Sequence, residues 1–172
     1  MPPSKICLFV GRFQPFHNGH LSVLKGMVKV CSKVVVGIGS SDGVMSDNPF
    51  TTQERREMIQ RALQDVDIIP AYDVELVDMP DETDDEAWAR RCVELAGGEV
   101  SAVWTGNEWT KKCFASIDVR IQEIKEVPGI SAAEVRRRML DDESWEELVP
   151  EEVAGYIKEI DGAPRVKNLA SD

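Results

Sequence analysis

Both histidines of this chain lie three residues apart in the stretch GRFQPFHNGH, which spans residues 11–20. The stretch follows the apolar run KICLFV, which is typical of a strand that is covered on both faces. Apolar residues then recur at helical spacing over residues 21–28, so we expect a helix to begin between His17 and His20.

Residues three apart on a helix share a face, so the two imidazoles are expected to point the same way. They would do so at a helix N-terminus, where free N–H groups and the positive end of the dipole favour an anion. Arg12 adds a fixed charge, and Gly19 lets the backbone approach a ligand closely. The pattern predicts a phosphate-binding site. Two alternatives are helix-terminal histidines with satisfied hydrogen bonds, and a zinc site, for which no third ligand stands nearby.

A second basic stretch, SAAEVRRR, begins at Ser131 and predicts another helix N-terminus. Ser131 is a candidate N-cap, and Glu134 would complete a capping box. SWEELV repeats the pattern of Ser followed three residues later by Glu. Arg136 lies on the first turns and could reach a phosphate, whereas Arg137 and Arg138 are interpreted as surface residues paired with neighbouring carboxylates.

The composition limits the possible partners. The chain has 172 residues, 42% hydrophobic and 30% charged, and its formal net charge is -11. Such acidity argues against a nucleic-acid or anionic-membrane surface, because both need a basic face. No stretch approaches the ~20 apolar residues of a membrane helix. An acidic protein can still bind phosphates where basic groups gather locally.

The four cysteines, Cys7, Cys31, Cys92 and Cys113, are widely spread and form no C-x-x-C pair. In a chain of this size we interpret them as reduced, mostly buried thiols of a cytoplasmic protein.

Strand and helix patterns alternate along the chain, ending in three short helical segments, SAAEVRRRML, SWEELV and PEEVAGYIKEI. This order predicts one α/β domain over residues 1–172, a Rossmann-like doubly wound parallel sheet with C-terminal helices. In such sheets ligands bind beyond the carboxyl ends of the strands. The segments expected at that edge are 11–20, 39–49, 78–85, 105–107 and 129–131.

The motifs also carry a family resemblance. GRFQPFHNGH resembles the signature of the nucleotidyltransferase superfamily with an H-x-G-H motif, and ISAAEVRRRM is similar to its second signature, I-S-x-T-x-x-R, with Ala133 in place of Thr. Together with NPFTTQER, TGN and EVRRRMLDDESWEELVP, they resemble the archaeal-type nicotinamide-mononucleotide adenylyltransferases from about Lys5 to Leu169.

The resemblance implies that the 5′-phosphate of nicotinamide mononucleotide attacks the α-phosphate of ATP, giving NAD and pyrophosphate. It also implies a homo-oligomer. Mg²⁺ is expected with ATP because the negative charges of ATP need neutralising, and the sequence offers no dedicated carboxylate site for the ion. The implied catalytic residues are His17, His20 and Arg136. The implied ATP-binding residues are Gly11, Arg12, Phe13, His17, His20, Gly106, Asn107, Ser131 and Arg136. The implied acceptor-binding residues are Arg12, Arg55, Asp78 and Trp88.

Several assignments have open alternatives. Arg55 could instead form a surface ion pair with Glu54 or Glu57, Trp88 could be a core residue, and Asn107 could cap a helix. The protein could transfer AMP or CMP to another phosphorylated acceptor, or bind nucleotides without catalysis. GIGSSDG is a poor match to a dinucleotide-binding turn, because its third Gly comes one position late.

Overall fold

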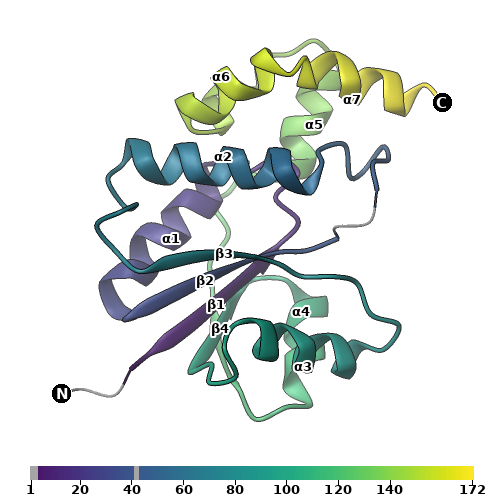
Figure 1. The fold of residues 1–172 in the computed structure, drawn as a ribbon. Helices are drawn as coiled ribbons and strands as arrows, with labels where there is room; N and C mark the ends of the chain where they lie inside the picture. Colours follow the sequence, from purple (N-terminus) through teal and green to yellow (C-terminus); the bar gives the residue numbers. More distant parts are fainter. Residues whose placement is uncertain (1–3, 41–42) are drawn as a thin grey trace.

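The computed structural model describes residues 4–40 and 43–172, and in these residues five parallel strands form one sheet in the order β3-β2-β1-β4-β5 (Figure 1). The strands are β1 (Ile6–Gly11), β2 (Lys33–Ile38), β3 (Val74–Asp78), β4 (Ala102–Thr105) and β5 (Arg120–Glu123). The helices are α1 (Asn18–Val30), α2 (Thr52–Asp65), α3 (Asp85–Leu95), α4 (Glu108–Ala115), α5 (Ala132–Leu140), the 3₁₀ turn η1 (Glu146–Leu148), α6 (Glu151–Glu159) and α7 (Gly162–Ala170).

The order of the strands fixes where a ligand can enter. Strand β1 pairs with β2 on one side and with β4 on the other, so consecutive connections leave β1 and β4 in opposite directions. Such a reversal leaves a crevice beyond the carboxyl ends of the two strands, where ligands bind in this class of fold. The α/β class and the parallel sheet expected from the sequence are confirmed.

Helices cover both faces of the sheet. Helices α1 and α2 lie on one face, and α5, α6 and α7 pack beyond them; α3 and α4 lie on the other face (Figure 1). The C-terminal helices contact α2 through an ion pair as well as through apolar packing. Arg165 of α7 makes two hydrogen bonds, of 2.6 and 2.9 Å, with the carboxylate of Glu54.

Three local expectations need correction. Helix α7 is a fourth C-terminal segment beyond the three expected; Pro164 stands in its first turn, where the missing N–H costs no helical bond. The box predicted at SWEELV is absent, since no side chain caps η1 and the Ser144 hydroxyl instead donates to Glu147. Ser131 caps α5 as predicted, but Glu134 binds Arg137 rather than closing the box.

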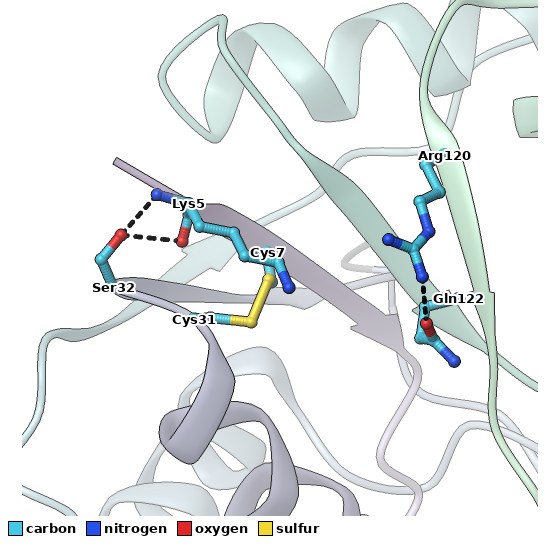
Figure 2. Close-up of a disulfide and its surroundings, with 6 residues drawn as sticks. All are labelled: Lys5, Cys7, Cys31, Ser32, Arg120 and Gln122. Carbon is cyan, nitrogen blue, oxygen red and sulfur yellow. Dashed lines mark hydrogen bonds between the residues drawn. A yellow bond between two sulfur atoms is a disulfide. The ribbon is translucent and has the colours of Figure 1, made fainter. Parts of the chain in front are cut away.

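The interpretation of all four cysteines as free thiols is wrong for two of them. Cys7 and Cys31 form a disulfide that joins the start of β1 to the residue after α1 (Figure 2). Beside it the Ser32 hydroxyl donates to the carbonyl of Lys5, which ties the same two segments together. No spacing rule predicts this pair, because it is the fold that brings together residues separated by 24 positions. Cys92 and Cys113 are buried free thiols, as expected.

No helix within residues 4–40 and 43–172 combines the length and the apolar character needed to cross a bilayer. The segment SSDGVMSDNP, expected to be a loop, lies outside the described residues at positions 41 and 42. Its remainder is non-helical and contains one isolated bridge, between Met45 and Asn48.

Candidate active site

A cavity of about 390 Å³ lies where the sequence predicts ligand binding, beyond the carboxyl ends of β1 and β4. Ten of the predicted site residues line it: Gly11, Arg12, Phe13, His17, His20, Trp88, Gly106, Asn107, Ser131 and Arg136. They come from the loops after β1 and β4 and from the start of α3 and of α5. The structure thus brings together residues from three separate motifs of the sequence.

The two histidines cap α1 reciprocally. The Nδ1 atom of His17 accepts hydrogen bonds from the backbone N–H groups of Gly19 (3.0 Å) and His20 (3.3 Å). The Nδ1 atom of His20 accepts one from the backbone N–H of His17 (3.1 Å). Their rings stack with centroids 3.6 Å apart. Capping and ligand binding are therefore not alternatives here, because capping uses one nitrogen of each ring.

This capping fixes the chemical form of the rings. A neutral imidazole whose Nδ1 atom accepts a hydrogen bond carries its proton on Nε2. Burial lowers the pKa of His17 from 6.5 to about 4, and burial together with the neighbouring His17 lowers the pKa of His20 well below 6.5. Both rings are neutral at pH 7, and each has an Nε2–H group that can donate to an oxygen.

Gly19 is needed for the geometry of the pair. A Cβ atom at this position would lie 2.8 Å from Cε1 of His17. A side chain would therefore push the His17 ring away from the backbone N–H groups that it caps. The glycine between the histidines therefore makes room for a ring, and it also lines the cavity, so close approach of a ligand to its backbone stays a prediction.

Two arginines line the same cavity from distant parts of the chain. Arg136 of α5 donates from Nη1 to the carbonyl oxygen of Gln14 (2.7 Å), which orients the guanidinium along the loop after β1. Arg12 is about half exposed and makes an ion pair of 3.5 Å with Asp47. Since the whole chain has a net charge of -11, these cations are a local exception that suits a phosphate ligand.

The structure does not bring Arg55 and Asp78 into the cavity. Arg55 is 1% exposed and its guanidinium binds backbone carbonyls, so neither the predicted acceptor contact nor the alternative surface ion pair describes it. Asp78 lies at the end of β3 and pairs with Arg56 at 2.6 Å. Arg137 binds Glu134, Asp141 and Glu143, which confirms its interpretation as a surface residue.

Sequence reasoning missed Gln14, which is 1% exposed and supports the loop after β1. Its side-chain amide donates to the carbonyl of Phe50 (2.9 Å) and accepts from the N–H of the same residue (2.9 Å). The available signal was a polar residue between Phe13 and Pro15 in an otherwise apolar turn, which could have indicated a buried side chain with hydrogen-bond partners. Gln14 binds the histidine-bearing loop to the start of α2.

Trp109 is the second residue that was missed. It is 50% exposed, lines the cavity and contacts Trp88, with ring centroids 4.7 Å apart. Trp88 is 5% exposed, so it belongs to the core and to the cavity wall at once. Asn107 caps α4 with its side chain, as one of the two alternatives predicted, and the residue also lines the cavity, so its contact with a nucleotide stays a prediction.

Within the described part of the chain, no group of three or more His, Cys, Asp or Glu side chains is placed to hold a metal ion. Asp81 and Glu126 are the carboxylates found on the cavity wall in this part of the chain. The zinc alternative for the histidines gains no support, because no metal-binding cluster includes them in the described residues and, with Nδ1 accepting from the backbone, Nε2 carries the proton.

Comparison with known proteins agrees with this geometry. The profile of the cytidylyltransferase-like family matches residues 8–138. The chain is 44% identical over 168 residues to a nicotinamide-nucleotide adenylyltransferase of Thermococcus sibiricus, covering 96% of this chain and 89% of the relative. Relatives with the same name from Thermococcus kodakarensis and Pyrococcus furiosus are 40% and 39% identical, again over 96% of this chain and 88% and 89% of theirs.

Solved structures share the fold. A bifunctional NMN adenylyltransferase/ADP ribose pyrophosphatase from Francisella tularensis, in complex with AMP and a manganese ion, superposes with a TM-score of 0.76 at 20% identity. The match covers 98% of this chain and 52% of that one, so this chain spans about half of its length. A nicotinic acid mononucleotide adenylyltransferase from Plasmodium falciparum gives a TM-score of 0.66 at 13% identity, covering 94% and 98% of the two chains. The chain belongs to the cytidylyltransferase-like family and, within it, to the nicotinamide-nucleotide adenylyltransferases.

Proposed function

We propose that this protein transfers the adenylyl group of ATP to nicotinamide mononucleotide, giving NAD and pyrophosphate. An oxygen of the 5′-phosphate of nicotinamide mononucleotide attacks the α-phosphorus of ATP. The bond between that phosphorus and the oxygen that bridges to the β-phosphate breaks, and pyrophosphate leaves with the electron pair. A reaction of this kind needs little covalent help from the protein, since positioning and charge neutralisation supply most of the acceleration.

The observation that carries the proposal is the pair of imidazoles at the N-terminus of α1, both of which line the same cavity while their Nδ1 atoms cap the helix, so that capping does not use the Nε2–H groups. Hydrogen-bond donors fixed before the ligand arrives stabilise the charge that develops on phosphate oxygens without reorganising. His17 and His20 would contact the triphosphate of ATP, and the backbone caps would keep both rings in place through the reaction.

The remaining cavity residues have proposed roles that follow from their chemistry. Arg136 and Arg12 would neutralise the phosphates of ATP and of the acceptor. Ser131, at the N-terminus of α5, would add a polar contact to ATP, and Gly106 would let the nucleotide approach the loop after β4. Trp88 and Trp109 would offer aromatic surfaces to the nicotinamide ring, which is a cation.

We propose that ATP enters together with Mg²⁺. Because the described residues contain no cluster of metal ligands, phosphate oxygens and water would hold most of the coordination sphere of the ion. The protein would supply the surrounding cations, and the ion would reduce the repulsion between the two phosphorylated substrates.

Three further assignments remain proposals. We propose that residues 1–172 form one nucleotidyltransferase domain, that the protein assembles as a homo-oligomer, and that it acts in the cytoplasm. Light scattering of the purified chain tests the assembly, and cell fractionation tests the location.

The direct test is pyrophosphate release from ATP with a panel of phosphorylated acceptors. The panel contains nicotinamide mononucleotide, nicotinic acid mononucleotide, phosphopantetheine and an alcohol phosphate, each with ATP or CTP. We expect turnover with ATP and nicotinamide mononucleotide, with NAD identified as the product. Turnover with another acceptor and none with nicotinamide mononucleotide would contradict the proposal.

A further inference from the structure

Arg55 is a fully buried cation that the proposed reaction does not use directly. It is 1% exposed, and its Nη1 atom donates to the carbonyl oxygens of Arg12 (2.7 Å) and Gly39 (2.5 Å). Its Nη2 atom donates to the carbonyl of Ser40 (3.0 Å), and its Nε atom to the carbonyl of Thr51 (3.3 Å). One guanidinium therefore binds the backbone of three separate segments.

These contacts continue the sheet beyond its last strand residues. The pairing of β1 with β2 ends at Gly11 and Ile38, followed by one backbone bond from the N–H of Gly39 to the carbonyl of Gly11 (2.9 Å). Past this point the two segments separate around the cavity, and their carbonyls have no strand partner. The five N–H groups of a guanidinium can satisfy several carbonyls at once. Arg55 thus replaces the missing strand contacts.

The carbonyl groups that Arg55 gathers belong to the cavity wall. Arg12, Gly39 and Ser40 all line the cavity, whereas Arg55 lies behind them. The carbonyl oxygen of Arg12 accepts the hydrogen bond from Arg55, whereas the side chain of Arg12 is about half exposed at the cavity. Fixing the backbone of Arg12 therefore fixes the starting point of the side chain that is available to a phosphate.

Arg55 keeps its charge although it is buried. Burial lowers its pKa to about 10; the nearby carboxylate of Asp78 opposes this effect, and the charge of Arg12 adds to it. The guanidinium is charged at pH 7. In the described residues no carboxylate lies within ion-pair distance of Arg55, but the charges of Asp78 and Asp81 act on it and partly compensate its charge. We therefore expect Arg55 to influence a ligand chiefly through the backbone that it holds.

We propose that Arg55 is a positioning residue for the phosphate end of the nucleotide site, acting through Arg12: it holds the loops after β1 and β2 together and places the Arg12 guanidinium against the triphosphate. The proposal rests on the proposed function, because it takes the ligand to be a nucleoside triphosphate. A purely structural Arg55 would stabilise the fold without any special dependence on Arg12.

A double-mutant cycle separates the two possibilities. The variants are Arg12→Ala, Arg55→Met and their combination, and the measured quantity is the dissociation constant of ATP, determined by calorimetry. Arg61→Met is the matched control, because Arg61 lies on the same helix and binds Glu57 and Glu159 away from the cavity. Direct binding of ATP stays measurable if nicotinamide mononucleotide is not the acceptor, so the two proposals can fail separately.

We expect Arg55→Met to weaken ATP binding about 10-fold or more in the unaltered chain, and less than about 3-fold when Arg12 is already alanine. The control should leave ATP binding unchanged. The proposal would be overturned if the loss of ATP affinity in the double variant equals the product of the losses in the two single variants. Unchanged ATP affinity in Arg55→Met would also overturn it.

Arg55→Lys provides the test if Arg55→Met fails to fold. Lysine keeps the charge, but its single ammonium cannot bind all the carbonyls in the planar arrangement of a guanidinium. We expect ATP affinity reduced by about 3-fold to 10-fold in this variant, with the reduction again depending on Arg12. ATP affinity equal to that of the unaltered chain, accompanied only by a lower Tm, would overturn the proposal.

Discussion

The imidazole rings of His17 and His20 stack 3.6 Å apart, and each binds backbone N–H groups of the turn that they share. The Nδ1 atoms serve the helix and leave the Nε2–H groups for a ligand. One pair of side chains thus caps the N-terminus of α1 and, by our proposal, also donates to phosphate oxygens. The capping role and the proposed catalytic role thus fall on the same two positions, and variants must be chosen to separate them.

Replacing His20 separates the two roles. His20→Ala removes both the cap and the Nε2–H donor, so we expect turnover to fall about 100-fold, the usual scale for one preorganised donor. The free energy of unfolding should fall by about 1 kcal/mol for the cap alone. In His20→Asn the side-chain oxygen can still accept the His17 N–H, so we expect most of the stability to return and the turnover to stay low. Steady-state rates and chemical denaturation of both variants measure this. Equal turnover in all three proteins would show that the ring has no catalytic role.

The lowered histidine pKa values predict a pH dependence of stability. Between pH 6.5 and about 4.5 the unfolded chain binds protons on His17 and His20, whereas the folded chain keeps both rings neutral. The unfolded state binds more protons, so stability falls as the pH falls, by up to about 1.4 kcal/mol per pH unit for each histidine. Urea denaturation at pH 7, 6 and 5 measures this slope. His17→Asn should flatten the slope, and an unchanged slope would mean that burial does not keep this ring neutral.

The disulfide between Cys7 and Cys31 predicts a redox dependence of stability. It closes a loop between residues separated by 24 positions. A disulfide across a loop of that length adds about 3.5 kcal/mol to the free energy of unfolding, because it restricts the unfolded chain. For a chain of this size we expect reduction to lower Tm by about 10 °C. Calorimetry with and without a reducing agent measures the shift. The double variant Cys7→Ser, Cys31→Ser is the control, and its Tm should not respond to the reducing agent; a Tm that responds equally would place the effect elsewhere.

Trp109 predicts an acceptor-specific effect. It is half exposed at the cavity, so Trp109→Ala should change the free energy of unfolding by less than about 1 kcal/mol. Stacking on an aromatic side chain contributes about 1–2 kcal/mol of binding free energy. Its loss should raise KM for nicotinamide mononucleotide by about 10-fold and change KM for ATP much less. Initial rates with each substrate varied in turn measure the two constants. Tyr72→Ala, an equally exposed aromatic outside the cavity wall, should change neither constant. A larger effect on ATP would reassign the Trp109 surface to adenine.

The sequence predicts the sheet and the position of the site because buried strands and helix starts depend on local patterns. The strand before Gly11 and the helix after His17 follow directly from apolar spacing. The shared edge of the sheet then brings Gly11, Asn107 and Arg136 together, since parallel strands end on the same side.

The rest depends on packing that no local pattern encodes. Arg55 occupies the same stripe of α2 as Met58, Ile59 and Ala62, and this spacing was a signal of burial that its charge concealed. The disulfide joins a strand to the end of a helix, and only the three-dimensional fold makes its two residues neighbours. Trp109 lies two residues after Asn107, in the first turn of α4. Its sequence context gives no sign that it lines a cavity, because single exposed aromatic residues are common on helices.

The hydrogen bond from Arg136 to the carbonyl of Gln14 joins positions separated by 122 residues. On the ribosome the turn that holds both histidines is synthesised early, whereas Arg136, which lines the same cavity, emerges only when most of the chain has been made. Prematurely terminated products that lack α5 would hold the histidines without this cation, so competence for catalysis should arise late in translation.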